Sequence, residues 1–448
     1  MKLDDIKGLM AAGKFQEALD ASEMIEAKDR YFYYERAKAH LSLKSYRAAV
    51  SEIDCVLSMK SDWLGAHGIK ISALLSLGVE VELAAAVFVM VNHAAGVSDR
   101  HAVFRNLFNE ILDSSLEEKL SLLSSCLEYY RYICGEDCIY LFFSGVVDAN
   151  RGYDETAAKK FALLSDGDVD SLGRHATGAL SFRYGSDLVK VSNGLSAYKQ
   201  KISVLKGINE LSSGSRSVIF AACDSNYFEM FSDVFISSFD FHLKDKICHI
   251  HVVNPTDAII EKAIVISKCL SNFNFSYERS GFNSPIYFAA SRFVVLEQIV
   301  DLYDMDVLVC DIDAAFIDDF SVNHILGGEH NIVVKADAKC SLHSYPWRGL
   351  AAGFFAVKND RLTIDFVRSL KSFIMNFILD SAHEKIWYFD QTAIYCLLKH
   401  FSQSSKSFSS GFIYGETSKM IVYPDARKET KEEFALNHGR PAAWLSNG

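Results

Sequence analysis

Apolar and polar positions follow two different patterns along the chain, which divides it into two parts. In the first part apolar residues recur at helical spacing, and one short pattern returns at residues 9–19, 41–50 and 75–86. Phe15 of the first copy corresponds to Tyr46 of the second. Recurrence at intervals of about 30 to 35 residues is typical of helix pairs that stack in series, so this part is predicted to be a helical solenoid.

The recurring pattern resembles the tetratricopeptide repeat, in which a small residue at the turn is followed by an aromatic residue and then by an alanine. The alanines are Ala18 and Ala49, and a looser copy lies at residues 149–158. The resemblance implies a concave surface that holds a polypeptide. The plainer alternative is a helical layer that covers the other domain or makes the protein a homodimer.

From about residue 217 the pattern changes to short β-branched and aromatic runs separated by helical segments. These runs lie at residues 217–222, 247–253, 273–278 and 307–310. Strands that alternate with helices predict an α/β domain with a mixed, mostly parallel sheet. A Ser/Gly-rich stretch at 211–216 precedes the change. We therefore expect a helical-repeat domain over 1–205 and an α/β domain over 214–448.

Composition is that of an ordinary globular protein, because 50% of the 448 residues are hydrophobic and 23% are charged. A net charge of −11 and a pI near 5.7 argue against a nucleic-acid or anionic-membrane partner, which would favour a basic face. The first twenty residues carry Asp4, Asp5 and Glu17, unlike a signal peptide, and no apolar run is long enough to span a membrane. The ten cysteines form no CxxC pair, which favours reduced thiols and a cytoplasmic location.

The strongest candidate for chemistry lies at the end of the run at 307–310. Asp311 and Asp313 follow this apolar run directly. Side chains of a strand repeat every two residues, so both carboxylates are expected on one side of the sheet edge. Two hard oxygen ligands in this position suit Mg²⁺ or Mn²⁺ bound to the phosphates of a nucleotide.

Taken in order, the segments of 217–448 resemble the A-type (GT-A) glycosyltransferases, most closely the family-8-like retaining sugar transferases. The resemblance assigns Asp224 and Asn226, which follow the first strand, to the nucleotide base. It also implies that Arg292, in the helix before the acidic strand, faces the nucleotide. The implied donor is a nucleotide-sugar, with UDP as the expected nucleotide.

The same resemblance assigns the metal and the reacting groups. Its implied ligands of Mn²⁺ or Mg²⁺ are Asp311, Asp313 and His438. Arg440 is the implied cation beside the phosphates, and Asp390 and Gln391 match a pair beneath the reacting sugar. Ala351 stands where the family has an asparagine beside the acceptor, which puts that contact in doubt.

The resemblance implies a metal-dependent retaining glycosyltransferase, whose acceptor could be a protein recruited by the helical repeats. The alternative is a helical-repeat adaptor with a catalytically degenerate transferase-like domain, which Ala351 favours and the intact Asp-x-Asp pair opposes. Phosphatases of the haloacid dehalogenase type also use such a strand, but there the motif begins the domain. His249 and His251 are expected to be half-buried strand residues, because no third metal ligand is near them in the sequence.

Overall fold

A computed structural model describes residues 3–26, 28–94, 96–110, 116–172, 176–182, 201–207, 217–336, 345–380, 388–424, 430, 433–434 and 437. The chain forms two compact units. The first comprises Met1–Arg183 with Leu342–Pro346, and the second comprises Tyr184–Ser341 with Trp347–Gly448.

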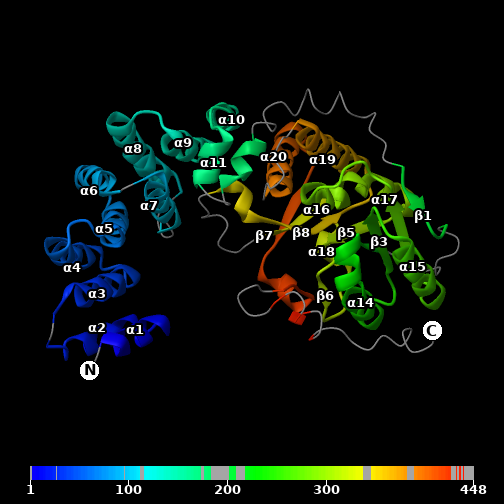
Figure 1. Ribbon diagram of the computed structural model, residues 1–448, viewed down its shortest axis with the longest axis horizontal. Coiled ribbons are helices and arrows are strands. Elements are labelled where there is room, and N and C mark those ends of the chain that lie inside the picture. The colour runs from blue at the N-terminus through cyan, green and yellow to red at the C-terminus, as the bar shows by residue number, and fades with distance from the viewer. Residues whose placement is uncertain are drawn as a thin grey trace. The chain divides into compact units, whose positions relative to one another are not determined.

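The first unit is helical throughout its described residues. Its helices are α1 (Leu3–Ala11), α2 (Phe15–Ser22), α3 (Arg30–Ser42), α4 (Tyr46–Met59), α5 (Leu64–Leu77), α6 (Glu80–His93), α7 (Val97–Glu110), α8 (Leu116–Cys134), α9 (Cys138–Arg151), α10 (Asp154–Ala162), α11 (Asp166–Leu172) and α12 (Gly178–Phe182). Successive helices pack as pairs, as Figure 1 shows for α3 with α4 and α5 with α6. The helical region expected from the sequence is confirmed.

Four turns between paired helices share one backbone conformation. Gly13, Lys44, Gly78 and Gly152 all have positive φ, and a new helix begins two residues after each of them. Glycine adopts this left-handed conformation without a steric penalty, whereas Lys44 accepts a cost. The turns recur where the sequence pattern recurs, so the pattern marks real helix pairs. The assignment to the tetratricopeptide family stays a prediction.

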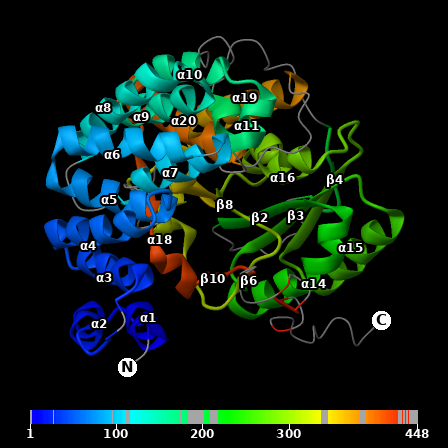
Figure 2. The ribbon, with the colours of Figure 1, turned by 60° about the vertical axis from the view of Figure 1, so that its left-hand side comes forward.

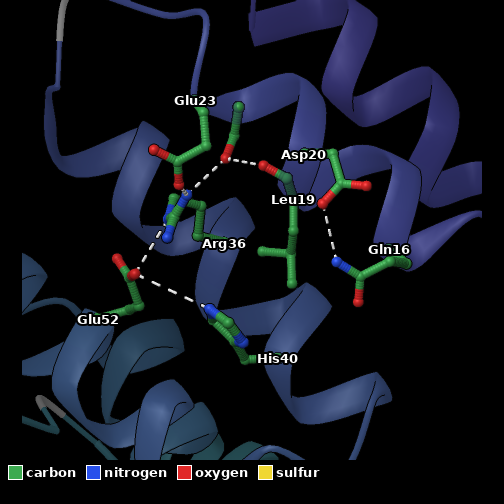
Figure 3. Close-up of polar contacts among 8 residues, drawn as sticks. Gln16, Leu19, Asp20, Glu23, Arg36, His40 and Glu52 are labelled. Carbon is green, nitrogen blue, oxygen red and sulfur yellow. Dashed lines mark hydrogen bonds and ion pairs between the residues drawn. The ribbon is translucent and has the colours of Figure 1, made fainter.

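Arg36 on α3 links three consecutive helices (Figure 3). Its Nε donates to Glu52 Oε1 on α4 at 2.9 Å, and its Nη1 donates to Ser22 Oγ at 2.6 Å and to Glu23 Oε1 at 2.7 Å. His40 Nε2, one turn along α3, lies 3.9 Å from the same Glu52 oxygen. Burial alone would lower the pKa of Arg36, but its two carboxylate partners outweigh burial and raise it. The link fixes how α2, α3 and α4 stack.

A residue from far along the sequence completes this helical unit. Tyr345 is fully buried and shares a hydrogen bond of 3.2 Å with His101 Nε2 on α7. Its ring meets Phe142 of α9 edge-on, with ring centroids 5.4 Å apart. The helical core therefore uses a side chain that the sequence had assigned to the other domain.

The second unit is built on an eight-stranded sheet with the order β1-β4-β3-β2-β5-β8-β7-β9. Its strands are β1 (Ser203–Val204), β2 (Ser217–Asp224), β3 (Ile247–Val253), β4 (Phe273–Glu278), β5 (Asp306–Cys310), β7 (Ile332–Ala336), β8 (Leu350–Val357) and β9 (Ser410–Ile413). β4, β3, β2 and β5 are parallel, while β8 runs antiparallel to both β5 and β7. The predicted mixed, mostly parallel sheet is confirmed.

Helices cover both faces of this sheet (Figures 1 and 2). One face carries α14 (Ser225–His242) and α15 (Asp257–Cys269). The other face carries α16 (Pro285–Val294), α17 (Leu296–Tyr303), α19 (Arg361–Asp380) and α20 (Phe389–Ser404). Smaller elements are β6 (Ala315–Phe316), which pairs with β10 (Ile421–Val422), α18 (Val322–Leu326) and the 3-10 turns η5 (Pro346–Gly349) and η6 (Gly415–Lys419). Coverage on both faces explains the unbroken apolar runs of the central strands.

The two histidines of β3 are fully buried, so the expectation of half-buried positions was wrong. His249 Nδ1 lies 2.6 Å from Tyr303 Oη of α17, and its Nε2 lies 2.7 Å from Ser276 Oγ of β4. His251 Nδ1 lies 2.9 Å from the same serine oxygen. The reason is that helices pack over this face of β3 as well as the opposite one.

The edge of the sheet begins earlier in the chain than the sequence suggested. β1 pairs antiparallel with β4, so Ser203 and Val204 lie in the sheet although the sequence placed them in the helical domain. A strand of two residues is too short to show the alternation of apolar and polar residues from which strands are predicted. The Ser/Gly-rich stretch at 211–216 lies outside the described residues. Over the part of the chain that the structure describes, no helix has the length and apolar character needed to cross a membrane.

Candidate functional site

The strand order changes direction between β2 and β5, which are neighbours in the sheet. Leading away from β2, the chain builds β3 and β4 on one side and then crosses to add β5 on the other. At such a switch point of an α/β sheet, ligands bind outside the carboxyl ends of the strands. Asp224 ends β2 and Asp311 follows β5 at this edge. Since β7 runs with β5 and β8 runs against it, the end of β7 and the start of β8 lie here too.

Arg292 of α16 joins two carboxylates at this edge. Its Nη1 lies 2.5 Å from Asp311 Oδ1, and its Nη2 lies 3.1 Å from Asp390 Oδ2. The Arg292 side chain is only 9% exposed, whereas that of Asp311 is 35% exposed. Asp390 lies in the first turn of α20, where its Oδ1 accepts a hydrogen bond from the Gln391 amide at 2.8 Å. Folding thus brings together three of the residues that the sequence predicted for the site.

The charges in this cluster do not balance. Burial alone would lower the pKa of Arg292, but the charges of Asp311, Asp390 and Asp313 outweigh burial and raise it. Burial raises the pKa of Asp390, although the Arg292 charge works in the opposite direction. The charges of three carboxyl groups thus act on one buried guanidinium, which makes this edge of the sheet locally acidic.

Asp311 and Asp313 lie in a turn and not on a strand. β5 ends at Cys310, and the Ala314 amide donates to the Asp311 carbonyl at 3.3 Å as the chain turns. The expectation that strand periodicity sets their directions was therefore wrong, because the strand stops one residue before the first carboxylate. Both side chains are partly exposed, and the negative charges of both carboxylates raise the pKa of Arg292.

β8 is irregular where it passes Asp311. The register between β7 and β8 shifts between Val334 and Lys335, so that Lys335 pairs with Ala351 and β8 has extra residues at this point. Gly353 is one of these residues, and a Cβ built on it would lie 2.1 Å from Asp311 Oδ2. Glycine inside a strand often marks such a bulge or a close approach, and here it makes room for the carboxylate.

The side chain of Tyr423, which follows β10, contacts Gly353. Its hydroxyl donates to the Gly353 carbonyl at 2.7 Å. Burial raises its pKa well above the usual value, and nearby Cys310, Asp311 and Asp313 add to this, so the phenol stays neutral. The sequence did not mark Tyr423, because a lone tyrosine in a loop carries no motif.

Two buried polar atoms at the site lack hydrogen-bond partners among the described residues. They are Arg292 Nε and Gln391 Oε1. A buried donor or acceptor without a partner costs free energy, and a polar ligand could satisfy both atoms. Gln391 adjoins Asp390, so this pair predicted from the sequence lies beside the Arg292 cluster.

The two residues assigned to the nucleotide base lie at the end of β2. Asp224 caps α14, where its Oδ1 accepts from the Tyr227 amide at 2.8 Å. Asn226 is exposed in the first turn of that helix. Within the described residues, neither shares a hydrogen bond or ion pair with Arg292. The capping role explains Asp224 structurally without any ligand.

The metal site predicted from the sequence is only partly described. His438 and Arg440 lie outside the described residues, and across the described ones no group of three or more His, Cys, Asp or Glu side chains is arranged to hold a metal ion. Asp311 and Asp313 do offer hard oxygen ligands in partly exposed positions, as Mg²⁺ and Mn²⁺ prefer. These two residues therefore fit as part of such a site.

Comparison with known proteins finds similarity only among solved structures. No family model matches the chain, and no curated protein matches it. The glycosyltransferase GlyE of Streptococcus pneumoniae TIGR4 is 16% identical, with a TM-score of 0.30 over 44% of this chain and 45% of GlyE. The chain thus matches less than half of the length of GlyE.

Two further solved structures are similar at the same level. The WbbM bifunctional glycosyltransferase is 14% identical, with a TM-score of 0.36 over 67% of this chain and 64% of WbbM. Mouse xyloside xylosyltransferase 1 is 11% identical, with a TM-score of 0.31 over 48% of this chain and 99% of that protein. Because these TM-scores are low, the fold of this chain rests on its own strand order.

Proposed function

We propose that the α/β unit is a GT-A-type glycosyltransferase that uses a nucleotide-sugar donor. The observation that supports this most directly is the position of Arg292 between Asp311 and Asp390 at the switch point of the sheet. A cluster of carboxylates around one buried cation at this sheet edge suits a donor that brings a divalent metal and a diphosphate together. The motif order in the sequence points to the same class of reaction.

The donor would be held at its phosphates and its base. Asp311 and Asp313, with His438, would hold Mn²⁺ or Mg²⁺, which when bound stabilises the negative charge of the leaving diphosphate. Arg292 supplies fixed positive charge from a buried position, where electrostatic stabilisation is strongest. Arg440 would add a second positive charge beside the phosphates. Asp224 and Asn226 would contact the base, which we expect to be uracil. These two residues do not by themselves distinguish uracil from other bases.

The reacting sugar would lie over the start of α20. Asp390 is tied to Arg292 through Oδ2 and to the Gln391 amide through Oδ1, so it orients the guanidinium as an ion-pair partner. Gln391 Oε1 has no hydrogen-bond partner among the described residues and can accept one from a sugar hydroxyl. We infer retention at the anomeric carbon from the resemblance in sequence.

Substitution of Asp311 tests this proposal. Asp311→Asn should reduce Mn²⁺-dependent hydrolysis of UDP-sugars by roughly 100-fold, because loss of a direct metal ligand costs at least as much as loss of an outer partner. Asp318→Asn, at an exposed position a few residues away, is the matched control and should change little. Wild-type activity in Asp311→Asn, with an unchanged dependence on Mn²⁺ concentration, would show that the metal assignment is wrong.

Two observations favour the alternative of a degenerate, non-catalytic domain. Arg292 contacts the very carboxylate that would bind the metal, and Ala351 provides no amide beside the acceptor. A scaffold that has lost turnover would keep this ion pair permanently. Titration with Mn²⁺, followed by electron paramagnetic resonance with and without UDP, separates the two, because the scaffold would bind neither.

We further propose that the helical unit recruits a protein acceptor. Stacked helix pairs form extended surfaces that commonly bind polypeptides, and tethering raises the local concentration of a bound acceptor beside the transferase. Removal of residues 1–200 should leave slow donor hydrolysis but lose transfer to the native acceptor. Full transfer by a folded truncation would leave the helices with a role in stability or dimerisation only.

A further inference from the structure

Lys335 lies at the same edge of the sheet, and none of the sequence motifs gives it a role. It is the penultimate residue of β7, a strand whose carboxyl end lies at this edge. The neighbours Val334 and Ala336 are buried, whereas Lys335 is partly exposed. A lysine in this position can bury its stem along the sheet and keep its ammonium at the edge.

The irregularity of the sheet falls at this lysine. The register shifts directly before Lys335, which then pairs with Ala351. Bulges of this kind occur next to active sites, where they change the direction of a side chain. The residues of β8 around it, Ala351 and Gly353, are small and partly exposed. The register shift therefore places Lys335 beside small residues at the edge where Asp311 follows β5.

Tyr423 connects the lysine to the acidic turn. The Lys335 ammonium lies 5.0 Å from the centroid of the Tyr423 ring. The hydroxyl of that ring donates to the Gly353 carbonyl at 2.7 Å, and Gly353 packs directly against the Asp311 carboxylate. A continuous series of contacts thus runs from the ammonium to the predicted metal ligand.

We propose that Lys335 is an anion-binding residue of this sheet edge and contacts the diphosphate of the donor. This inference rests on the proposed function and extends it to a residue outside the motifs. Arg292 is already shared between two carboxylates, so a second cation is needed to match the charge of a diphosphate. A charge-assisted hydrogen bond from an ammonium to phosphate is stronger than a cation–π contact at a partly exposed site, so a diphosphate would compete with the Tyr423 ring for Lys335.

The test compares two lysines that both lie over tyrosine rings. Lys335→Met keeps the apolar stem and removes the charge. Lys399→Met is the matched control, because the Lys399 ammonium lies 5.7 Å from the Tyr395 ring on α20 and this lysine is also partly exposed. Calorimetry with the full chain and Mn²⁺ should show UDP binding about 10-fold or more weaker in Lys335→Met only, and uridine binding unchanged in both. Lys335→Arg should restore most of the UDP affinity.

Each outcome decides the inference separately from the proposed function. Unchanged UDP affinity in Lys335→Met would overturn the role of Lys335 and leave the proposed transferase intact. If the wild-type chain does not bind UDP, the proposed function fails, and inorganic pyrophosphate then decides about Lys335. Pyrophosphate binding that is lost only in Lys335→Met supports the anion site, while absent or unchanged pyrophosphate binding overturns it.

Discussion

Gly353 shows how the absence of one side chain makes room for the Asp311 carboxylate. The space that a Cβ would occupy is filled by the Asp311 carboxylate, whose Oδ2 would lie 2.1 Å from it. No real contact is that short, so any larger residue must move the carboxylate or the strand. Movement of the strand is restricted, because the Tyr423 hydroxyl donates a hydrogen bond to the Gly353 carbonyl.

We predict that Gly353→Ala displaces Asp311 and weakens Mn²⁺ binding. Forcing a methyl group into this space should also destabilise the fold by about 1–3 kcal/mol, as for overpacking elsewhere. Gly281→Ala is the control, since nothing lies within 4 Å of its added Cβ. Urea unfolding and Mn²⁺ titration check both effects. Equal Mn²⁺ affinity in Gly353→Ala and wild type would contradict the packing of Asp311 against Gly353.

His249 is a residue whose environment fixes its protonation state. Asn274 Nδ2 donates to Tyr303 Oη at 2.8 Å, so the tyrosine proton is directed to His249 Nδ1 at 2.6 Å. The remaining proton of the ring then lies on Nε2, which donates to Ser276 Oγ. Burial, together with a smaller contribution from the neighbouring His251, lowers the pKa of His249 to about 3. A neutral ring is therefore part of the folded core.

This neutral ring predicts loss of stability in acid. The pKa of His249 is about 3 in the folded chain and has its ordinary value of 6.5 in the unfolded chain. Between these two pH values the unfolded chain therefore binds a proton that the folded chain excludes. The contribution is complete above pH 6.5 and falls by about 1.4 kcal/mol per pH unit as the pH drops through this window.

Urea unfolding between pH 7 and pH 4 measures this slope. His249→Gln should flatten it, whereas His324→Gln, at an exposed position of α18, should leave it unchanged. Nitrogen chemical shifts provide a check that does not depend on the folding of the variant. A doubly protonated His249 ring at pH 5 in the folded wild type would show that the prediction is wrong.

At the level of helices and strands, the packing of α7 and α9 depends on a segment that arrives late in the chain. Tyr345 fills the space between them, where its ring contacts Phe142 and Phe143 and its hydroxyl contacts His101. The helices alone leave this position empty. Their stability is therefore coupled to the correct placement of residues 345–346.

We predict that Tyr345→Ala destabilises the helical unit by about 3 kcal/mol, as for other large-to-small changes of buried aromatic residues. Tyr345→Phe keeps the ring and loses one hydrogen bond, which should cost about 1 kcal/mol. Hydrogen exchange of the full chain should show faster exchange in α7 and α9 for the alanine variant. Identical protection of these helices in all three proteins would mean that Tyr345 contributes nothing to their core.

For the whole molecule, the question is where the α/β unit begins. β1 lies at the sheet edge, and beyond it the buried Asn274 side chain accepts from the Lys206 amide and donates to the Lys206 carbonyl, each at 3.2 Å. The Leu205 amide also donates to the Phe275 carbonyl at 2.9 Å. A chain that starts at residue 214 loses all of these bonds.

We therefore predict that residues 201–448 form a more stable fragment than residues 214–448. Loss of the two hydrogen bonds between Lys206 and the buried Asn274 side chain should cost about 1–3 kcal/mol, although this side chain keeps its bonds to Tyr303 and to the Phe275 amide. Urea unfolding of the two fragments, compared with the full chain, measures the difference. Equal stability would return the boundary to the position that the sequence suggested.

Much of the architecture was predictable from the sequence. The paired helices, the strands that became β2, β3, β4 and β5, and the mixed sheet all follow from apolar periodicity, which is a local property of the chain. The Asp-x-Asp pair marked the right edge of the sheet because parallel strands that alternate with helices end there together. The position of this pair at the sheet edge was predictable, although the turn that holds both carboxylates was not, and their role as a site stays a prediction.

The sequence by itself determined which segments are helices or strands and which residues end them, because these depend on neighbours a few positions away. Only the tertiary structure decided which distant side chains meet. Asp311 lies against Gly353, Arg292 bonds Asp390 from 98 positions away, and Tyr345 bonds His101 from 244 positions away. Such contacts depend on how whole elements pack, so no spacing within a single segment could specify them.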